Sequence, residues 1–147
     1  MYKEICMRIF ATRYFSRFAK HEGLSDEKIT DAIEELVKGL HDGNLGGNVY
    51  KKRVPLAGRG KRGGARTIVA IKIAVDVSSN AFLLYGYPKN KRDNITHEEE
   101  AAFKKLAEQY FAMTAPAINR LLKQGELIEV QHHGDSKKAK SKSKSKK

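Results

Sequence analysis

The sequence has 147 residues, with 29 Lys plus Arg, 17 Asp plus Glu and a formal net charge of +12. This length fits a single domain of roughly 100 to 150 residues, which argues against a multidomain enzyme with separate cofactor and substrate modules. One cysteine, Cys6, cannot form an internal disulfide, and no apolar run approaches the roughly 18 residues of a membrane-spanning helix, so we expect a soluble cytoplasmic protein.

The N-terminal third predicts a strand followed by two helices. Residues 4–10 are apolar and partly β-branched, which favours a strand. Helical spacing places Phe15 and Phe18 on one face of residues 12–21, and Gly23 is the expected end of that helix. Ser25 is a suitable N-cap for a second helix, whose apolar stripe consists of Ile29, Ile33, Leu36, Val37 and Leu40. The glycine-rich segment 41–48 then predicts a turn.

The middle of the chain predicts three consecutive strands, because apolar and polar residues alternate there. The alternating segments are 48–54, 66–75 and 81–87. Short links favour an antiparallel meander, with residues 76–80 as a hairpin turn. Thr96 and Glu99 then form a capping box at the start of a long helix, followed by a short helix at 118–123 and a strand at 127–130. We therefore predict an α+β fold, in which two N-terminal helices and a C-terminal helix pack on a small antiparallel sheet.

The positive charge is concentrated in two separate segments. Residues 48–92 carry 11 basic side chains and one acidic one, a net charge of +10, whereas residues 1–47 and 93–134 are slightly acidic. Residues 135–147 carry seven lysines and one aspartate. This last segment has too few apolar side chains to offset its ordering entropy, so we expect a domain at 1–134 and a disordered Lys/Ser-rich tail at 135–147.

Two kinds of site, for a dinucleotide and for a metal ion, are not supported by the sequence. The glycines at 58, 60 and 63 match a dinucleotide-binding fingerprint, but a predicted strand follows them where that fingerprint needs a helix. We interpret the segment as a flexible hairpin loop, with Arg59, Lys61 and Arg62 as candidate phosphate contacts. The histidines show no metal-ligand spacing, so we expect neither a metal nor a cofactor.

The cations on and beside the strands carry the functional prediction. They are Lys51, Lys52, Arg53, Arg66, Lys72, Lys89, Lys91 and Arg92, with Tyr50, Tyr85 and Tyr87 interleaved. Strand alternation places Lys51 and Arg53 on one face and Lys52 on the other. A solvated surface ordinarily mixes charges of both signs, so this unmixed charge indicates a polyanionic ligand. The aromatic rings favour single-stranded RNA, whose unstacked bases lie on such rings.

In three segments the sequence resembles the RelE/ParE superfamily of type II toxins, in particular its RelE-like HigB branch. The segments are residues 49–54, residues 63–69 and residues 82–95, and the resemblance covers roughly residues 4–130. It implies helices packed on a small antiparallel sheet. It also implies an mRNA interferase, an endoribonuclease that cuts messenger RNA on the ribosome to repress translation and that is neutralised by an antitoxin.

The resemblance also implies a metal-independent reaction in which the RNA 2′-hydroxyl attacks the adjacent phosphate. Such a reaction needs a base, an acid and cations that stabilise charge on the phosphate. The candidate catalytic residues are Lys51, Lys52, Arg53 and Arg66. Arg66 is the expected phosphate stabiliser, and crowding by Arg53 and Arg66 makes Lys51 or Lys52 the candidate base. The candidate RNA-binding residues are Arg59, Lys61, Arg62, Tyr85, Lys89, Lys91 and Arg92, of which Lys89 and Arg92 are also candidate acids.

Two other functions compete with this one. A ParE-like toxin would inhibit DNA gyrase through protein contact without nuclease activity, but such members generally lack the cluster of cations on the sheet. A non-catalytic RNA-binding module would use the same cations without cleaving. The sequence also has Thr96 where some RelE-type toxins have a tyrosine that stacks on the substrate base, and Tyr85, Tyr87 and His97 are the candidates to replace it. For the antitoxin, charge complementarity predicts an acidic amphipathic segment.

Overall fold

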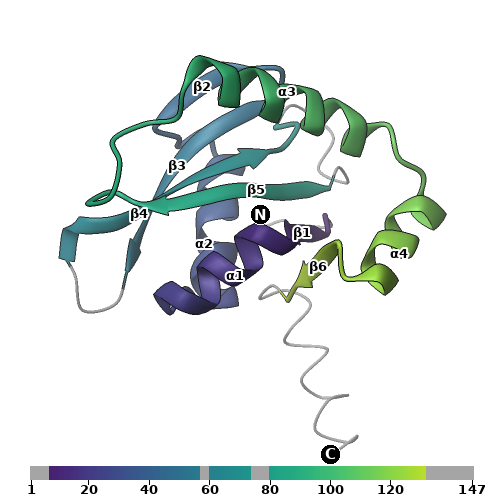
Figure 1. Cartoon of the computed structure of the whole chain (residues 1–147), viewed down its shortest axis with the longest axis horizontal. Coiled ribbons are helices and arrows are strands. Elements are labelled where there is room, and N and C mark those ends of the chain that lie inside the picture. The colour runs from purple at the N-terminus through teal and green to yellow at the C-terminus, as the bar shows by residue number, and fades with distance from the viewer. Residues whose placement is uncertain (1–6, 57–59, 74–79, 132–147) are drawn as a thin grey trace, which may run out of the picture.

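The computed structural model describes residues 7–56, 60–73 and 80–131. Its strands are β1 Ile9–Thr12, β2 Gly43–Gly46, β3 Val49–Leu56, β4 Gly60–Ala70, β5 Ala81–Pro88 and β6 Leu127–Val130. Its helices are α1 Arg13–Glu22, α2 Asp26–Val37, α3 His97–Phe111 and α4 Ala115–Gln124 (Figure 1). Over these ranges, none of the helices combines the length and apolar content that crossing a bilayer requires.

The strands form one six-stranded sheet in the order β2-β3-β4-β5-β1-β6. The antiparallel meander predicted for the middle of the chain is confirmed, because β3 pairs with β4 and β4 with β5 in antiparallel register. β1 pairs with β5 in parallel and with β6 in antiparallel. The fold is therefore α+β, as expected, with a sheet that is antiparallel except at the β1–β5 pair.

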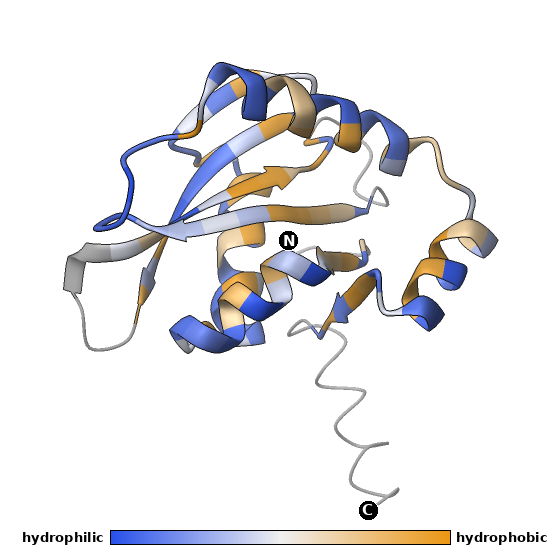
Figure 2. Ribbon diagram, in the orientation of Figure 1, coloured by the Kyte–Doolittle hydropathy of each residue, from blue (hydrophilic) through white to orange (hydrophobic). Residues whose placement is uncertain are grey.

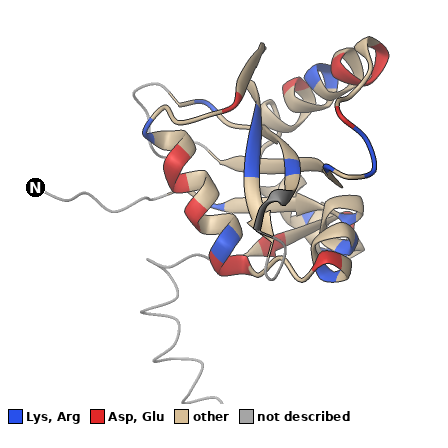
Figure 3. Ribbon diagram, turned by 90° about the vertical axis from the view of Figure 1, so that its left-hand side faces the viewer, with Lys and Arg blue, Asp and Glu red and all other residues tan. Residues whose placement is uncertain are grey.

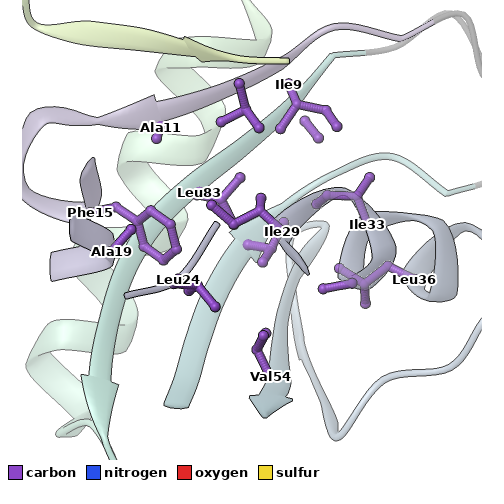
Figure 4. Packing of buried hydrophobic residues seen from close by; sticks show 14 of the residues in the cluster. Ile9, Ala11, Phe15, Ala19, Leu24, Ile29, Ile33, Leu36, Val54 and Leu83 are labelled. Atoms are coloured by element: carbon purple, nitrogen blue, oxygen red, sulfur yellow. The ribbon is translucent and has the colours of Figure 1, made fainter. Parts of the chain in front are cut away.

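Helices cover both faces of the sheet, so the core is divided into two layers (Figure 1). On one face, α1 and α2 contribute Phe15, Ile29, Ile33 and Leu36, which pack with Leu83 and other strand residues (Figure 4). On the other face, Ala107 and Tyr110 of α3 pack with strand residues that include Ile68, Ala70 and Phe82. In the hydropathy colouring, β1 and β6 and parts of the longer strands are orange, and the helices combine orange and blue segments (Figure 2).

The helix boundaries confirm the capping signals of the sequence. The side chains of Thr12 and Ser25 accept hydrogen bonds from the first turns of α1 and α2. Thr96 and Glu99 form the complete capping box predicted for α3. Gly23 and Gly125 adopt left-handed conformations, with φ of 73° and 76°, at the C-terminal ends of α1 and α4. Each cap satisfies backbone groups that the helix itself leaves unpaired.

Several sequence predictions need correction. Residues 43–46, expected in a turn, form β2, and the two-residue link Gly47–Asn48 has positive φ at both positions, as a type I′ hairpin turn requires. β4 begins at Gly60, so part of the predicted glycine-rich loop is strand. β1 is at 9–12, so residues 7 and 8 of the predicted strand 4–10 are not in a strand, and residues 4–6 are not described. α2 ends before Leu40, and α4 begins at Ala115. Cys6, the predicted turn at 76–80 apart from Asn80, and the predicted tail lie outside the described residues.

Candidate RNA-binding site

The register of the sheet places cations and aromatic residues in two adjacent rows on the face that α3 covers. One row consists of Lys51, Ile68 and Tyr85, which are paired across β3, β4 and β5. The next row consists of Arg53, Arg66 and Tyr87. The described residues of these three strands include no acidic side chain, and most Asp and Glu lie on the helices (Figure 3). We call the surface over the two rows the cationic face.

Arg66 is the central residue of the cationic face. Its Cα lies between those of Arg53 and Tyr87, and its Nη1 atom is buried without a hydrogen-bond partner among the described residues. The exposed Arg53 stands directly across the β3–β4 pair. Like charges directly opposite one another destabilise a sheet, and a buried donor without a partner costs free energy. An anion beside these two guanidinium groups would relieve both costs.

Lys51 and the loop after β5 border the cationic face. The Lys51 Nζ atom donates to Asn94 Oδ1 at 3.2 Å, and the Tyr87 hydroxyl donates to the Asp93 carbonyl at 3.4 Å. Burial raises the pKa of Tyr87, although the charges of Arg66 and Arg92 oppose this shift. Tyr87 is therefore a neutral donor at physiological pH, and it connects Arg66 to the loop.

Arg92 differs from Arg66 because a carboxylate already neutralises it. Its guanidinium binds Glu99 through two hydrogen bonds, of 2.6 and 3.2 Å, and Nη1 also donates to the Tyr85 hydroxyl at 3.1 Å. The hydrogen bond from Arg92, followed by the one from the Thr96 backbone, lowers the pKa of Glu99, and the Glu99 hydrogen bond raises the pKa of Arg92. Arg92 therefore attaches the loop to the first turn of α3 and offers little uncompensated charge.

Arg92 contacts a stack of aromatic rings. The Tyr85 ring contacts Tyr14 at a centroid distance of 5.0 Å, Phe103 at 5.2 Å and Tyr87 at 5.8 Å. The Arg92 guanidinium lies 5.4 Å from the Tyr87 ring centroid. Tyr14 comes from α1, and the sequence prediction missed it. The signal in the sequence that could have indicated it is the position of Tyr14, an aromatic residue next to Phe15 and on the polar side of an amphipathic helix.

A comparison with protein-family models supplies the assignment. Residues 7–130 match the model described as the RelE toxin of the RelE/RelB toxin-antitoxin system. The chain belongs to the RelE toxin family. A comparison with curated proteins found no match. The predicted superfamily is thus confirmed, and with it the role of this RelE-family toxin as the toxin of a toxin-antitoxin pair, while the HigB branch stays a prediction.

The structure does not place every predicted site residue of the RelE-family toxin on the cationic face. Lys52 points to the face that α2 covers and is 7% exposed. Its Nζ atom lies 2.6 Å from Glu35 Oε1 and donates to the Leu40 carbonyl at 3.0 Å. Tyr50 also packs on that face. These contacts give Lys52 a structural role and separate it from Arg53 and Arg66, as strand alternation predicted.

Four of the remaining predicted RNA-binding residues lie at the start of β4 or in the turn after β5. Lys89 and Lys91 are exposed in the turn after β5, and the Lys89 amide donates to the Gly64 carbonyl at 3.2 Å, two residues before Arg66. Lys61 and Arg62 belong to β4, but their side chains are not among those described. Arg59 lies outside the described residues. The backbone of Lys89 thus lies beside β4, close to Arg66.

Among the described cavities, none has Arg66 or Tyr87 in its lining, and Arg53 borders a small one on the side of α2. A cavity of about 630 Å³ lies at the far end of α3, where Gly47, Lys72 and Phe111 are among its lining residues. Arg53, Arg66 and Tyr87 do not line it. Within the described ranges, no cluster of three or more His, Cys, Asp or Glu has an arrangement suited to a metal ion. A row of cations along neighbouring strands suits a polymeric anion better than a small enclosed ligand.

Proposed function

We propose that this RelE-family toxin is an endoribonuclease that cuts ribosome-bound mRNA in the cytoplasm without a metal ion. The Arg53–Arg66 pair carries the proposal. Two cations face each other across β3 and β4, and one buried guanidinium nitrogen has no partner within the described part of the chain. A backbone phosphate bound between them would accept hydrogen bonds from both guanidinium groups, which match phosphate geometry well.

The proposed reaction divides among groups that lie near this pair. The RNA 2′-oxygen attacks the adjacent phosphorus, the bond from phosphorus to the 5′-oxygen breaks, and the products carry a 2′,3′-cyclic phosphate and a 5′-hydroxyl. A base takes the 2′-hydroxyl proton, and an acid gives a proton to the leaving 5′-oxygen. Arg53 and Arg66 stabilise the charge that develops on the phosphate.

The strand geometry narrows the candidates for base and acid. Of the predicted bases, Lys51 shares the cationic face with Arg66, whereas Lys52 is buried under α2. Of the predicted acids, Lys89 lies beside the cationic face, whereas Arg92 is held by Glu99. We therefore propose Lys51 as the base and Lys89 as the acid. Arg92 then orders the loop and Tyr85 supports the aromatic stack.

RelE-family toxins pair with an antitoxin. We propose that an acidic segment of this partner covers Arg53 and Arg66 and competes with RNA for them. The support is electrostatic, since residues 48–92 have a net charge of +10 and the described residues of β3, β4 and β5 have no carboxylate of their own. Complementary charge of this kind speeds association and selects the partner.

Expression of the toxin and its variants in bacterial cells tests this function. Arg66→Ala is expected to lose growth arrest and mRNA cleavage, because removing one transition-state donor costs about 10²-fold to 10³-fold in rate. Lys20→Ala is the matched control, since it removes one exposed cation from α1, away from the cationic face. Undiminished cleavage by Arg66→Ala would contradict the proposal. Inhibition of gyrase supercoiling with intact mRNA would instead support the ParE-like alternative.

A further inference from the structure

Tyr14 is an exposed aromatic residue at the edge of the cationic face. It belongs to the first turn of α1 and is 53% exposed, one of the largest exposed fractions among the bulky apolar and aromatic residues of the described ranges. Its ring lies nearly parallel to that of Tyr85, at 5.0 Å between centroids and 15° between planes. Tyr85 thus covers one face of the Tyr14 ring, while about half of the surface of Tyr14 stays exposed.

The rings behind Tyr14 have no comparable free surface. Tyr85 contacts Phe103 and Tyr87 in addition to Tyr14, and Tyr87 is only 3% exposed. The sequence suggested Tyr85 and Tyr87 as rings for RNA bases, but neighbouring side chains already pack on these two residues. Tyr14 is the accessible end of the same stack.

The Tyr14 ring is also held in place before any ligand binds. Its ring stacks on that of Tyr85, whose hydroxyl accepts a hydrogen bond from Arg92. Arg92 in turn is fixed by two hydrogen bonds to Glu99. A ring fixed in this way loses little conformational entropy on binding, which favours a stacking contact.

The stack lies close to the proposed phosphate site. Tyr85 and Tyr87 are two residues apart on one face of β5, which is about 7 Å along a strand. Tyr87 pairs directly with Arg66, so the stack and the phosphate-binding guanidinium groups occupy neighbouring rows. A single-stranded RNA that binds a phosphate at Arg66 can therefore extend along β5 toward Tyr14.

We propose that the outer face of Tyr14 is a binding site for one unpaired RNA base next to the scissile phosphate. The inference rests on the proposed ribonuclease function and adds a positioning residue from α1 that is not part of the sheet. Stacking of a base on an aromatic side chain tolerates any sequence, because every base has a π-face. Tyr14 therefore contributes affinity and placement, while cations and general acid–base groups perform the chemistry.

Binding of a non-cleavable RNA tests the proposal. The probe is a short single-stranded RNA with 2′-O-methyl groups at every ribose and 2-aminopurine at one position, whose fluorescence falls when the base stacks. Tyr14→Leu is expected to weaken binding about 5-fold to 150-fold and to abolish the fluorescence loss at the stacked position. Tyr14→Phe keeps the ring and is expected to bind like the unmodified protein. Leu40→Ala removes another exposed apolar side chain, three residues after the end of α2, and serves as the control.

An abasic nucleotide at the stacked position completes a double-mutant cycle. If Tyr14 binds that base, the unmodified protein binds the abasic RNA more weakly than the intact RNA. Tyr14→Leu then binds the two RNAs with equal affinity. Unchanged affinity and fluorescence for Tyr14→Leu, with Arg66→Ala still impaired, would overturn the Tyr14 site and leave the ribonuclease function standing. RNA binding that needs neither Tyr14 nor Arg66 would overturn both. A role of Tyr14 in protein contact alone predicts the first of these two results.

Discussion

Lys51 and Lys52 are adjacent in the sequence, and we expect them to have different roles. Substituting each lysine alone separates an effect on the cleavage rate from an effect on the stability of the fold. Lys52 is 7% exposed, and Lys52→Ala removes three buried methylenes at about 0.8 kcal/mol each. It also removes the hydrogen bond to the Leu40 carbonyl, which adds about 1 kcal/mol. We expect the free energy of unfolding to fall by about 3 kcal/mol. Lys52→Met keeps the stem and is expected to cost about 1 kcal/mol, since the partner Glu35 is half exposed and the ion pair adds little.

Lys51→Ala is expected to have the opposite profile. Lys51 is half-buried, and within the described residues its side chain makes one hydrogen bond, of 3.2 Å to Asn94, so its loss costs less than about 1 kcal/mol. As the proposed base, however, Lys51 is expected to be worth about 10²-fold to 10⁴-fold in cleavage rate. Urea denaturation followed by circular dichroism measures the stability, and single-turnover cleavage per folded molecule measures the rate. Normal cleavage by Lys51→Ala together with strongly impaired cleavage by folded Lys52→Met would refute the assignment.

Three further predictions follow from the contacts. Gly86→Ala is expected to lower the free energy of unfolding by about 1 to 3 kcal/mol, because the added Cβ would lie 2.6 Å from two Phe18 ring carbons. Thermal unfolding measures the change in stability, and an unchanged melting temperature would contradict the prediction. Arg66→Ala and Arg53→Ala are each expected to reduce the slope of log affinity against log salt for single-stranded RNA by about 0.7, as lost phosphate contacts require, whereas Lys20→Ala should not. Glu99 has a lowered pKa in the folded state, so its stabilising effect is present above the ordinary pKa of about 4.3 and is lost as the pH falls through the lowered pKa. Glu99→Gln should therefore flatten the decline of the free energy of unfolding below about pH 4.3. An unchanged decline would contradict this.

Local signals in the sequence were sufficient for the helices and the meander. Thr96 with Glu99 and Ser25 predicted helix starts because capping depends on a few neighbouring residues. Alternation predicted that Lys51 and Lys52 point to opposite faces, because the side-chain period of a strand is two. The place of β1 between β5 and β6 was beyond such reasoning, since strand order depends on which distant apolar faces pack together. The strand β2 was missed because its glycines are typical of a turn.

The candidate site was predicted in part for a similar reason. The charge of the strands and the resemblance to RelE-type toxins pointed to Arg53 and Arg66, and the structure pairs them across β3 and β4. The sequence also suggested Arg92 as a phosphate ligand and Glu99 as part of a capping box. These two interpretations gave no sign that Glu99 would neutralise Arg92. Tyr14 is more than 70 residues from Tyr85, so only the packing of α1 beside β5 shows that their rings stack. Contacts between distant segments were therefore the missing information.

Cleavage of mRNA on purified ribosomes is the most direct test of the central claim, which is that the Arg53–Arg66 pair binds a phosphate that the RNA 2′-hydroxyl attacks. The measurement is the chemical nature of the product ends, with a second mRNA that carries a 2′-deoxy nucleotide at the cleavage position. The account predicts 2′,3′-cyclic phosphate and 5′-hydroxyl ends, no cleavage of the deoxy mRNA, and at least about 10²-fold slower cleavage by Arg66→Ala. Efficient cleavage of the deoxy mRNA, or equal rates for Arg66→Ala and the unmodified toxin, would contradict it.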